Sequence, residues 1–348
     1  MSSPYQDLPK RNFWRSAVAE RNGPGYPDIY RKKFSVTPTD KIATAGSCFA
    51  QHIARHLRKR AFTVLDLEPP FHLSDQAIAH SFGYGLYSAR YGNIYTACQL
   101  YQLCSEALGK HQPAFPIWEK DGRYFDALRP SVEPYGLASP EEVADHRKAH
   151  LGFVRELLTA ADVFVFTLGL TETWIHADSG TVYPTAPGTI AGSFDPAVYK
   201  FKNFNFNEVY SDLDLFWRLM KSINPTVKMI LTVSPVPLTA TAGEEHALAA
   251  TIYSKSVLRA AAGMFAGQNH DVDYFPSYEI ISGFPSKAIF FEDNCRNVTD
   301  AGVETVMETF FGQHCNTETV LETSKRAPSP SDSEDVVCEE QLLEAFAP

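Results

Sequence analysis

Residues 41–57 have the sequence KIATAGSCFAQHIARHL, in which a short apolar stretch leads through Gly46-Ser47-Cys48 into an amphipathic segment. The apolar stretch at 41–45 predicts a buried strand, and the segment at 49–60 predicts a helix. A strand followed directly by a helix is the repeating unit of α/β proteins. These residues therefore predict an α/β fold with a polar turn at the carboxyl end of its first strand.

Strands and helices alternate along the rest of the chain. Further strands are predicted at residues 62–67, 162–168, 227–233 and 272–277. Further helices are predicted at residues 95–108, 140–161, 207–223, 245–267 and after Thr299. This alternation predicts a three-layer α/β/α sandwich around a mostly parallel, flavodoxin-like sheet. Functional groups are expected at the carboxyl ends of its strands.

The composition argues against several classes of protein. A formal net charge of −10 disfavours binding to a nucleic-acid backbone. The sequence has no run of roughly 18 apolar residues and no signal-peptide pattern, so we expect no membrane partner. Its six cysteines form no C-x-x-C pair and no zinc-type spacing, which predicts reduced thiols and no metal site. We expect a cytoplasmic protein without a cofactor.

Three regions are predicted along the chain. Residues 1–40 are expected to form an N-terminal arm, residues 41–315 the folded domain, and residues 325–348 a disordered acidic tail. Residues 338–346 carry Leu342, Leu343 and Phe346 at close spacing. This end of the chain is either a free tail or a short amphipathic helix that docks on a partner.

The turn Gly46-Ser47-Cys48 is the first candidate site. A side chain there lies near unpaired backbone N–H groups and the positive end of a helix dipole. Such a place stabilises a thiolate and an oxyanion beside it, and it lowers the pKa of a cysteine to roughly 3.5–7.5. In the alternative interpretation, Ser47 only caps the helix and Cys48 packs into the core.

Several stretches of the sequence resemble the GSCFA family, whose name is the sequence of residues 46–50. The matching stretches are residues 41–57, 91–95, 166–174, 232–237, 253–255 and 274–279. Their order covers about residues 40–312. The resemblance implies the fold of the SGNH (GDSL-type) hydrolases, enzymes that cleave or transfer acyl groups on sugars and lipids.

The first two SGNH blocks imply roles for two pairs of residues. In the first block, Cys48 takes the position of the nucleophile and Ser47 the position before it, although a one-residue shift in the turn would exchange them. The second block supplies an oxyanion-hole glycine, for which Gly92 beside Asn93 is the candidate. The alternative for Gly92-Asn93 is an ordinary turn.

The last two SGNH blocks are altered. Gly169-Leu170-Thr171-Glu172 stands in the third block, so that Thr171 replaces the oxyanion-hole asparagine. The last block normally holds Asp-x-x-His, with histidine as general base. Here Asp293 is followed at that spacing by Arg296, and Asn297 lies near the histidine position. Neither side chain can act as a base at neutral pH, so the usual triad is incomplete.

Three substitutes for the missing base are open. His52 lies one helical turn after Cys48, and His246 lies at the start of the helix at 245–267. A Cys48 already ionised by the helix terminus would need no base. Lys255 and Arg259, four residues apart, are predicted to lie on a solvated helix face rather than in an anion site. For Trp118 and Trp174, core packing is the default and sugar stacking the alternative.

These features predict an acyl hydrolase or acyltransferase that forms a covalent acyl-enzyme at the GSCFA turn. The expected substrate is a small-molecule or glycan ester, as in polysaccharide modification. The alternative is a catalytically inactive SGNH-like scaffold that binds a glycan or, through the C-terminal tail, a protein partner.

Overall fold

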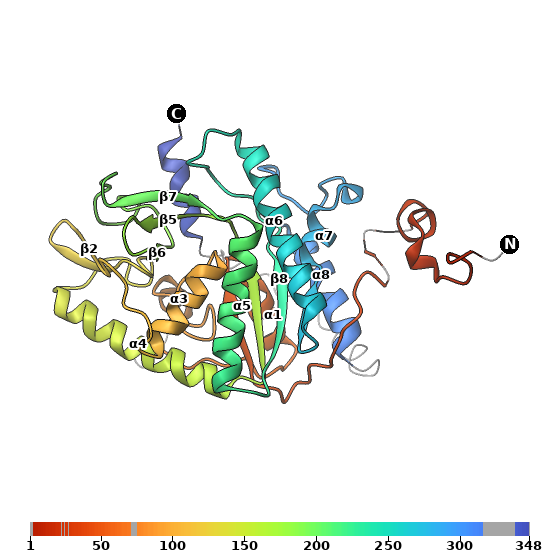
Figure 1. Ribbon diagram of the computed structural model, residues 1–348, viewed down its shortest axis with the longest axis horizontal. Helices are drawn as coiled ribbons and strands as arrows, with labels where there is room; N and C mark the ends of the chain where they lie inside the picture. Colours follow the sequence, from red (N-terminus) through yellow and green to blue (C-terminus); the bar gives the residue numbers. More distant parts are fainter. Residues whose placement is uncertain are drawn as a thin grey trace.

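The computed structural model describes residues 3–21, 23, 25–26, 28–70, 75–315 and 338–347. Its centre is a parallel sheet with the strand order β1-β4-β8-β9 (Figure 1). The four strands are β1 (Ile42–Gly46), β4 (Val163–Leu168), β8 (Lys228–Val233) and β9 (Val272–Phe275). The strand predicted at residues 62–67 is reduced to a single parallel bridge, between Val64 and Ile42. With that bridge as second strand, the order is 2-1-3-4-5, the flavodoxin-like order.

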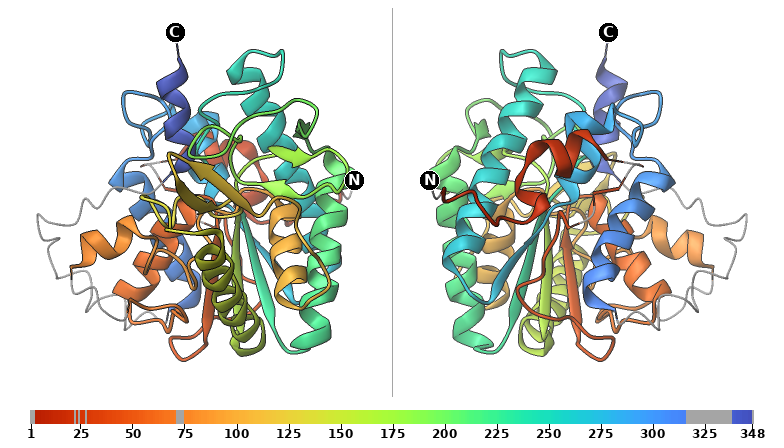
Figure 2. Two further views of the ribbon diagram at one scale, coloured as in Figure 1. Left: turned by 90° about the vertical axis from the view of Figure 1, so that its left-hand side faces the viewer. Right: turned by 90° about the vertical axis from the view of Figure 1, so that its right-hand side faces the viewer.

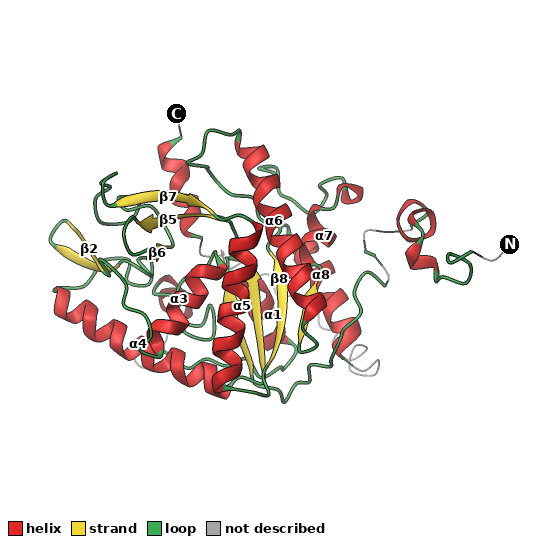
Figure 3. Ribbon diagram, in the orientation of Figure 1, coloured by secondary structure: helices red, strands yellow, loops and turns green. Residues whose placement is uncertain are grey.

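Helices cover both faces of this sheet (Figures 2 and 3). One face carries α1 (Phe49–Lys59), α7 (Ser277–Ser282) and α8 (Asp300–His314). The other face carries α3 (Ala97–Ala107), α4 (Pro140–Ala160), α5 (Phe206–Ile223) and α6 (Ala247–Gln268). The predicted three-layer α/β/α sandwich is therefore confirmed. A short helix, α2 (Gln76–Ser81), lies outside these two layers.

The buried side chains of β4 show why the sheet needs cover on both sides. Val163 and Val165 belong to the core under α1 and α8, whereas Phe164 and Phe166 belong to the core under α3 to α6. Successive residues of a strand point to opposite faces of the sheet. A continuous apolar run therefore places apolar side chains on both faces, and each face needs a covering layer of helices.

Two small sheets that the sequence analysis did not predict lie beyond the carboxyl ends of the central strands. One is the hairpin of β2 (Ile117–Lys120) and β3 (Arg123–Asp126), and the other has the antiparallel order β6-β5-β7. The three strands of the second sheet are β5 (Glu172–His176), β6 (Val182–Tyr183) and β7 (Tyr199–Asn203). Trp118 is buried between the two sheets and stacks on Tyr183, with ring centroids 5.4 Å apart. Trp118 is thus a core residue.

Two chain ends also pack on the domain. The N-terminal part contains a 3-10 helix, η1 (Lys10–Asn12), and a π-helix, η2 (Arg15–Ala19), neither of which has a buried residue. After them, Tyr30 is buried with its hydroxyl 3.0 Å from Asp273 Oδ2. A further turn, η3 (Phe284–Ser286), follows α7. Near the C-terminus, η4 (Glu339–Phe346) is a 3-10 helix beside β5 and β7 (Figure 1). The part of the predicted tail at 325–337 lies outside the described residues. Across the parts that are described, each helix is too short or too polar to cross a membrane.

Candidate functional site

The GSCFA turn lies where the strand order reverses, between β1 and β4. β1 pairs with β4 along its whole length, and the backbone N–H of Ser47 donates to the carbonyl of Thr167 at 3.0 Å. Gly46 has a φ of +139°, and a Cβ there would lie 2.4 Å from the same carbonyl oxygen. Only glycine tolerates this approach. The turn therefore lies at the switch point, where doubly wound sheets bind their ligands.

Ser47 lies against the loop that follows β4. A Cβ on Gly169 would come within 2.9 Å of the Ser47 Cβ. The N–H groups of Gly169 and Leu170 both donate to the carbonyl of Tyr95 at 3.0 Å, which ties this loop to the start of α3. The Ser47 hydroxyl is buried and has no hydrogen-bond partner within the described ranges. Its hydrogen bond is therefore left for a ligand or for water.

Cys48 lies at the N-terminus of α1 and is 6% exposed. Its thiol donates a hydrogen bond to Cys338, and that bond, together with burial, raises the pKa of Cys48 well above its usual value. The same bond lowers the pKa of Cys338, and the charge of Arg296 lowers it further. Burial and the hydrogen bond to Cys338 therefore oppose the thiolate that the sequence analysis expected at Cys48.

A carboxylate is bound beside this turn. Glu339 of η4 is 2% exposed and accepts hydrogen bonds from Asn93 Nδ2, from Ser131 Oγ and, at 2.9 Å, from Tyr95 Oη. A Cβ on Gly92 would lie 3.3 Å from Glu339 Oε1. Gly92 and Asn93 are therefore brought into the site, where they lie against two carboxylate oxygens.

A buried ion cluster holds the loop that carries Gly92 and Asn93. Glu68 accepts from the backbone N–H of Arg90 at 2.9 Å and lies 2.7 Å from His150 Nδ1. Arg129 donates to the carbonyl of Arg90 at 2.9 Å. Burial alone would raise the pKa of Glu68, but the hydrogen bond and charge of His150 and the charge of Arg129 lower it to about 2. An ionised Glu68 thus fixes the backbone next to Gly92.

Two cations lie on the other side of the turn. Lys255 of α6 is 1% exposed, and its Nζ donates to the carbonyl of Gly169 at 2.7 Å. Arg296, also buried, lies 3.6 Å from the sulfur of Cys338 and 3.5 Å from Glu340 Oε2. Burial lowers the pKa of Lys255, while its Coulombic interactions with Glu340 and Cys48 oppose that shift. The expectation that Lys255 lies on a solvated helix face was wrong, because η4 and the loop after β4 cover it.

The two histidines predicted as substitutes for the missing base make other contacts than one with Cys48. His246 is exposed, and its Nδ1 accepts from the backbone N–H of Leu248 at 3.1 Å, so that it caps α6. The ring of His52 packs on Phe49 with centroids 5.7 Å apart, and burial lowers its pKa to about 3. Neither ring makes a described contact with Cys48.

The last SGNH-like block contributes one residue to the site. Asp293 is exposed, and the backbone N–H of Asn297 donates to Asn294 Oδ1 at 2.9 Å in the turn before α8. Arg296 reaches Cys338 and Glu340, as described above. The block thus delivers a fixed cation, because an arginine is not deprotonated in a protein.

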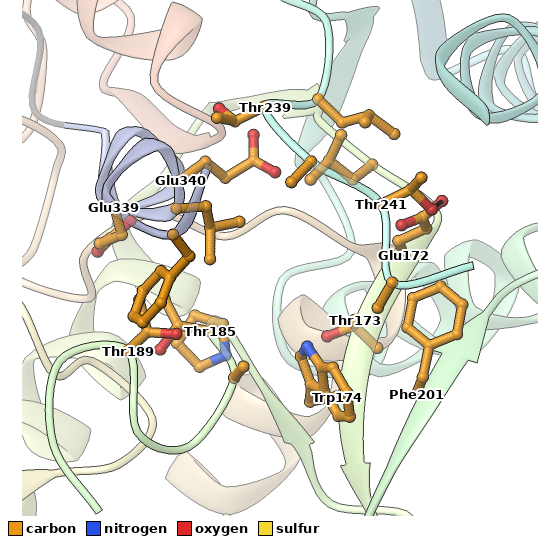
Figure 4. A pocket seen from close by; sticks show the side chains of 18 of the residues that line it. Glu172, Thr173, Trp174, Thr185, Thr189, Phe201, Thr239, Thr241, Glu339 and Glu340 are labelled. Atoms are coloured by element: carbon orange, nitrogen blue, oxygen red, sulfur yellow. Dashed lines mark hydrogen bonds between the residues drawn. The ribbon is translucent and has the colours of Figure 1, made fainter. Parts of the chain in front are cut away.

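A pocket of about 820 Å³ lies between η4 and the β5–β7 sheet (Figure 4). It meets the candidate site at Glu339 and Glu340, and its described lining includes no residue of the GSCFA turn. Trp174 and Phe201 line one side of it, and Glu339 and Glu340 the other. Glu172 also lines the pocket; burial raises its pKa, and Thr241 donates to it at 2.9 Å. The neighbouring Thr171 is fully buried, its hydroxyl without a partner among the described side chains, and it does not line the pocket.

The sequence analysis missed five residues of the site: Tyr95, Ser131, Cys338, Glu339 and Glu340. Tyr95 ends one of the family-like stretches, so its place in that motif was an available signal. Glu339 and Glu340 lie in a segment predicted to be disordered, and acidity alone predicted solvent exposure there. Their burial depends on the path of the chain after α8, which no local pattern predicts.

The fold defines a flavodoxin-like α/β protein with a cluster of buried polar residues at the switch point of its sheet. The sequence profile of the GSCFA family matches residues 41–310, and the chain belongs to that family. A comparison with curated proteins gave no match.

Solved structures with similarity to this chain include esterases. A carbohydrate esterase family 3 protein from Talaromyces cellulolyticus is 12% identical, with a TM-score of 0.28, over 67% of this chain and 93% of that one. A family 2 carbohydrate esterase from Corynascus thermopiles is 11% identical, with a TM-score of 0.30, over 80% of this chain and 68% of that one. An acetyl esterase mutant crystallised with acetate is 13% identical, with a TM-score of 0.26, over 49% of this chain. The match spans 62% of that esterase.

Proposed function

We propose that this protein is an acyl hydrolase or acyltransferase that forms a covalent acyl intermediate on Cys48 and acts on a carbohydrate-linked ester. One observation carries the proposal: a carboxylate, that of Glu339, is held by Asn93, Tyr95 and Ser131 beside the GSCFA turn. A carboxylate has the two-oxygen shape of the acid that an acyl-transfer reaction releases. Donors that hold a carboxylate are also placed to stabilise the oxyanion that forms when a nucleophile attacks the carbonyl carbon of an ester.

The reaction would begin with the thiolate of Cys48. When Cys338 no longer accepts its hydrogen bond, the charges of Arg296 and Lys255 favour the thiolate, since both carry Coulombic interactions with Cys48. The sulfur attacks the carbonyl carbon of the ester, and the carbonyl oxygen becomes an oxyanion held by Asn93 and Tyr95. No histidine is needed for this step.

The tetrahedral intermediate on Cys48 then collapses. The carbon–oxygen bond of the ester breaks, the departing sugar oxygen takes a proton from the Lys255 ammonium to become a hydroxyl, and a thioester remains on Cys48. Water, or the hydroxyl of an acceptor, attacks the thioester and returns its proton to Lys255. The carbon–sulfur bond then breaks, which releases the acid or the new ester and restores the Cys48 thiolate. Burial supports this role, because a lowered pKa lets a lysine exchange protons near neutral pH.

The aromatic wall of the pocket supports a sugar as the alcohol part of the substrate. Trp174 lines the pocket beside Phe201, opposite Glu340 (Figure 4). Aromatic faces bind the apolar faces of sugar rings, and the nearby hydroxyls of Thr173, Thr241 and Thr239 offer hydrogen bonds to a glycan.

A catalytically inactive scaffold that binds a glycan or a protein partner is the second candidate. It is favoured by the last SGNH-like block, in which Asn297 stands near the histidine position and neither His52 nor His246 has a described contact with Cys48.

The test is intact-protein mass spectrometry after brief exposure to p-nitrophenyl acetate near neutral pH, followed by peptide mapping. We expect an acetyl adduct on Cys48 that is absent from Cys48→Ala and present in the control Cys295→Ala, which removes an exposed thiol. An adduct lost only in Ser47→Ala would make Ser47 the nucleophile. A folded protein that forms no adduct at either residue would refute the covalent mechanism and favour the inactive scaffold.

A further inference from the structure

The C-terminal helix η4 occupies the candidate site with acidic groups. Cys338 is 9% exposed, and Glu339 after it is 2% exposed, although both belong to a strongly acidic end of the chain. Carboxylates are rarely buried without partners. Here the partners are site residues that come from the loop before α3, from α6 and from the turn before α8.

The first acidic position is that of Glu339. Three neutral donors hold its carboxylate, from Asn93, Tyr95 and Ser131, and Gly92 leaves room for one of its oxygens. Asn93 is itself held, because its Oδ1 accepts a hydrogen bond from the hydroxyl of Tyr87. Donors fixed in advance in this way favour a bound anion, since they need not reorganise around it.

The second acidic position faces Arg296 and Lys255. Glu340 Oε2 lies 3.5 Å from Arg296, and Cys338 lies 3.6 Å from the same guanidinium. Burial and the neighbouring Cys338 raise the pKa of Glu340, and its Oε2 nonetheless lies against the Arg296 guanidinium. The Nε of Arg296 has no hydrogen-bond partner in the part of the chain that the structure describes.

The two cations explain why an anion is required there. Lys255 and Arg296 are both buried. Two buried like charges without an anion are strongly destabilising, because each loses its hydration and they repel one another. A site with this pair is therefore built to contain acidic groups, whether they come from η4 or from a ligand.

We infer that this site binds an acyl ester that carries a second, anionic group, and that residues 338–346 fill it as a tethered mimic of that ligand. Glu339 takes the place of the reacting acyl carboxyl, and Cys338 with Glu340 takes the place of the anionic group. Assigning the first position to the acyl group rests on the proposed function. Binding of a two-acid ligand does not.

The pocket beside η4 fits this ligand. Leu343 and Phe346 of η4 line it together with Trp174 and Phe201, so departure of η4 would enlarge a space already about 820 Å³ in volume. A ligand that displaces η4 would gain the aromatic wall for its alcohol part. Free and tethered ligands therefore compete for one site.

Competition in the full-length chain tests the inference. The probe is a fluorescent peptide of residues 338–347, and the proteins are the wild-type chain and the double variant Glu339→Gln with Glu340→Gln. We expect the peptide to bind the double variant at least about tenfold more tightly than the wild type, whose own η4 holds the site. Glutarate, a dicarboxylate, should displace the peptide, and glutaramide, which has the same shape without charge, should not.

Two controls keep the outcome specific. Glu344→Gln removes an exposed charge of η4, and this variant should behave as the wild type does. Adding Arg296→Met to the double variant should abolish binding of both peptide and glutarate, with folding checked by circular dichroism. A peptide with glutamines at 339 and 340 that binds as well as the natural one would overturn the inference.

The two proposals fail separately. If peptide and glutarate bind as expected but no acyl adduct forms on Cys48 or Ser47, the acidic-ligand site stands and the covalent mechanism falls. If an adduct forms and glutarate does not compete, the covalent mechanism stands and the acidic-ligand site falls.

Discussion

The thiol of Cys48 donates a hydrogen bond to Cys338, so the first turn of α1 contacts the segment that carries η4. The candidate nucleophile and the segment that fills the site are thus directly connected. Any change that releases Cys338 also changes the protonation of Cys48.

Cys338→Ala is expected to speed the alkylation of Cys48. The substitution removes the acceptor that raises the Cys48 pKa and leaves the charges of Arg296 and Lys255, so the thiolate fraction at pH 7 increases. The measurement is iodoacetamide labelling over time, followed by peptide mapping. Cys295→Ala serves as control, because it removes an exposed thiol that forms no hydrogen bond to Cys48 among the described residues. Equal labelling rates of Cys48 in all three proteins would contradict the pairing of the two thiols.

Tyr95→Phe is expected to slow acetylation of Cys48 by about 10²–10³, the usual effect of losing one oxyanion donor. The substitution removes only the hydroxyl that lies 2.9 Å from Glu339 Oε2 and keeps the ring that packs at Gly169. The rate is followed by mass spectrometry with p-nitrophenyl acetate. Tyr210→Phe removes a hydroxyl on α5 that bonds Gln268, and it should leave the rate unchanged. A normal rate in Tyr95→Phe would remove Tyr95 from the proposed oxyanion hole.

Asp126→Asn is expected to destabilise the protein by about 3–5 kcal/mol, because it removes a buried carboxylate that pairs with two buried guanidinium groups and leaves each of them only one acidic partner, Glu68 or Glu106. Asp126 lies 2.8 Å from Arg129 and 3.0 Å from Arg147. Burial alone would raise the pKa of Asp126, but the charges of Arg147 and Arg129 lower it to about 2. Urea unfolding at pH 7 measures the loss, with the exposed Asp178→Asn as control.

The same carboxyl predicts a pH dependence. A folded-state pKa of about 2 lies below the ordinary value of 3.8. The stabilisation is therefore fully present above about pH 4 and is lost as the pH falls toward 2. Asp126→Asn should flatten this part of the stability curve. A variant with the same acid sensitivity as the wild type would show that Asp126 is not ionised in the native state.

Gly46→Ala and Gly152→Ala are expected to have opposite effects. At Gly46 a Cβ would meet the Thr167 carbonyl at 2.4 Å with φ at +139°, so we expect a loss of about 3 kcal/mol or more. Gly152 lies within α4, where a Cβ meets nothing within 4 Å, and alanine should stabilise by about 0.5–1 kcal/mol. Thermal unfolding of both variants checks the pair. A stable Gly46→Ala protein would contradict the close contact of the turn with β4.

Much of the fold was predictable because its signals are local. The apolar run of β4 and the caps at Ser139 and Thr299 lie where the sequence predicted them, and each depends on residues within one or two turns. The β5–β7 sheet was missed because its strands are short and partly exposed, so its pairing depends on neighbours more than on periodicity.

The sequence by itself determined the α/β class, the GSCFA turn at the end of β1 and the family, since these follow from short stretches of chain. Only the tertiary structure decided which polar groups meet at that turn. Glu339 accepts a hydrogen bond from Tyr95, which lies 244 residues away in the sequence. Lys255 is buried, although the residue pattern of α6 did not predict its burial. His246, a candidate base by position, caps a helix instead. Burial and charge pairing depend on what packs above a side chain, and that is a property of the folded chain rather than of its local sequence.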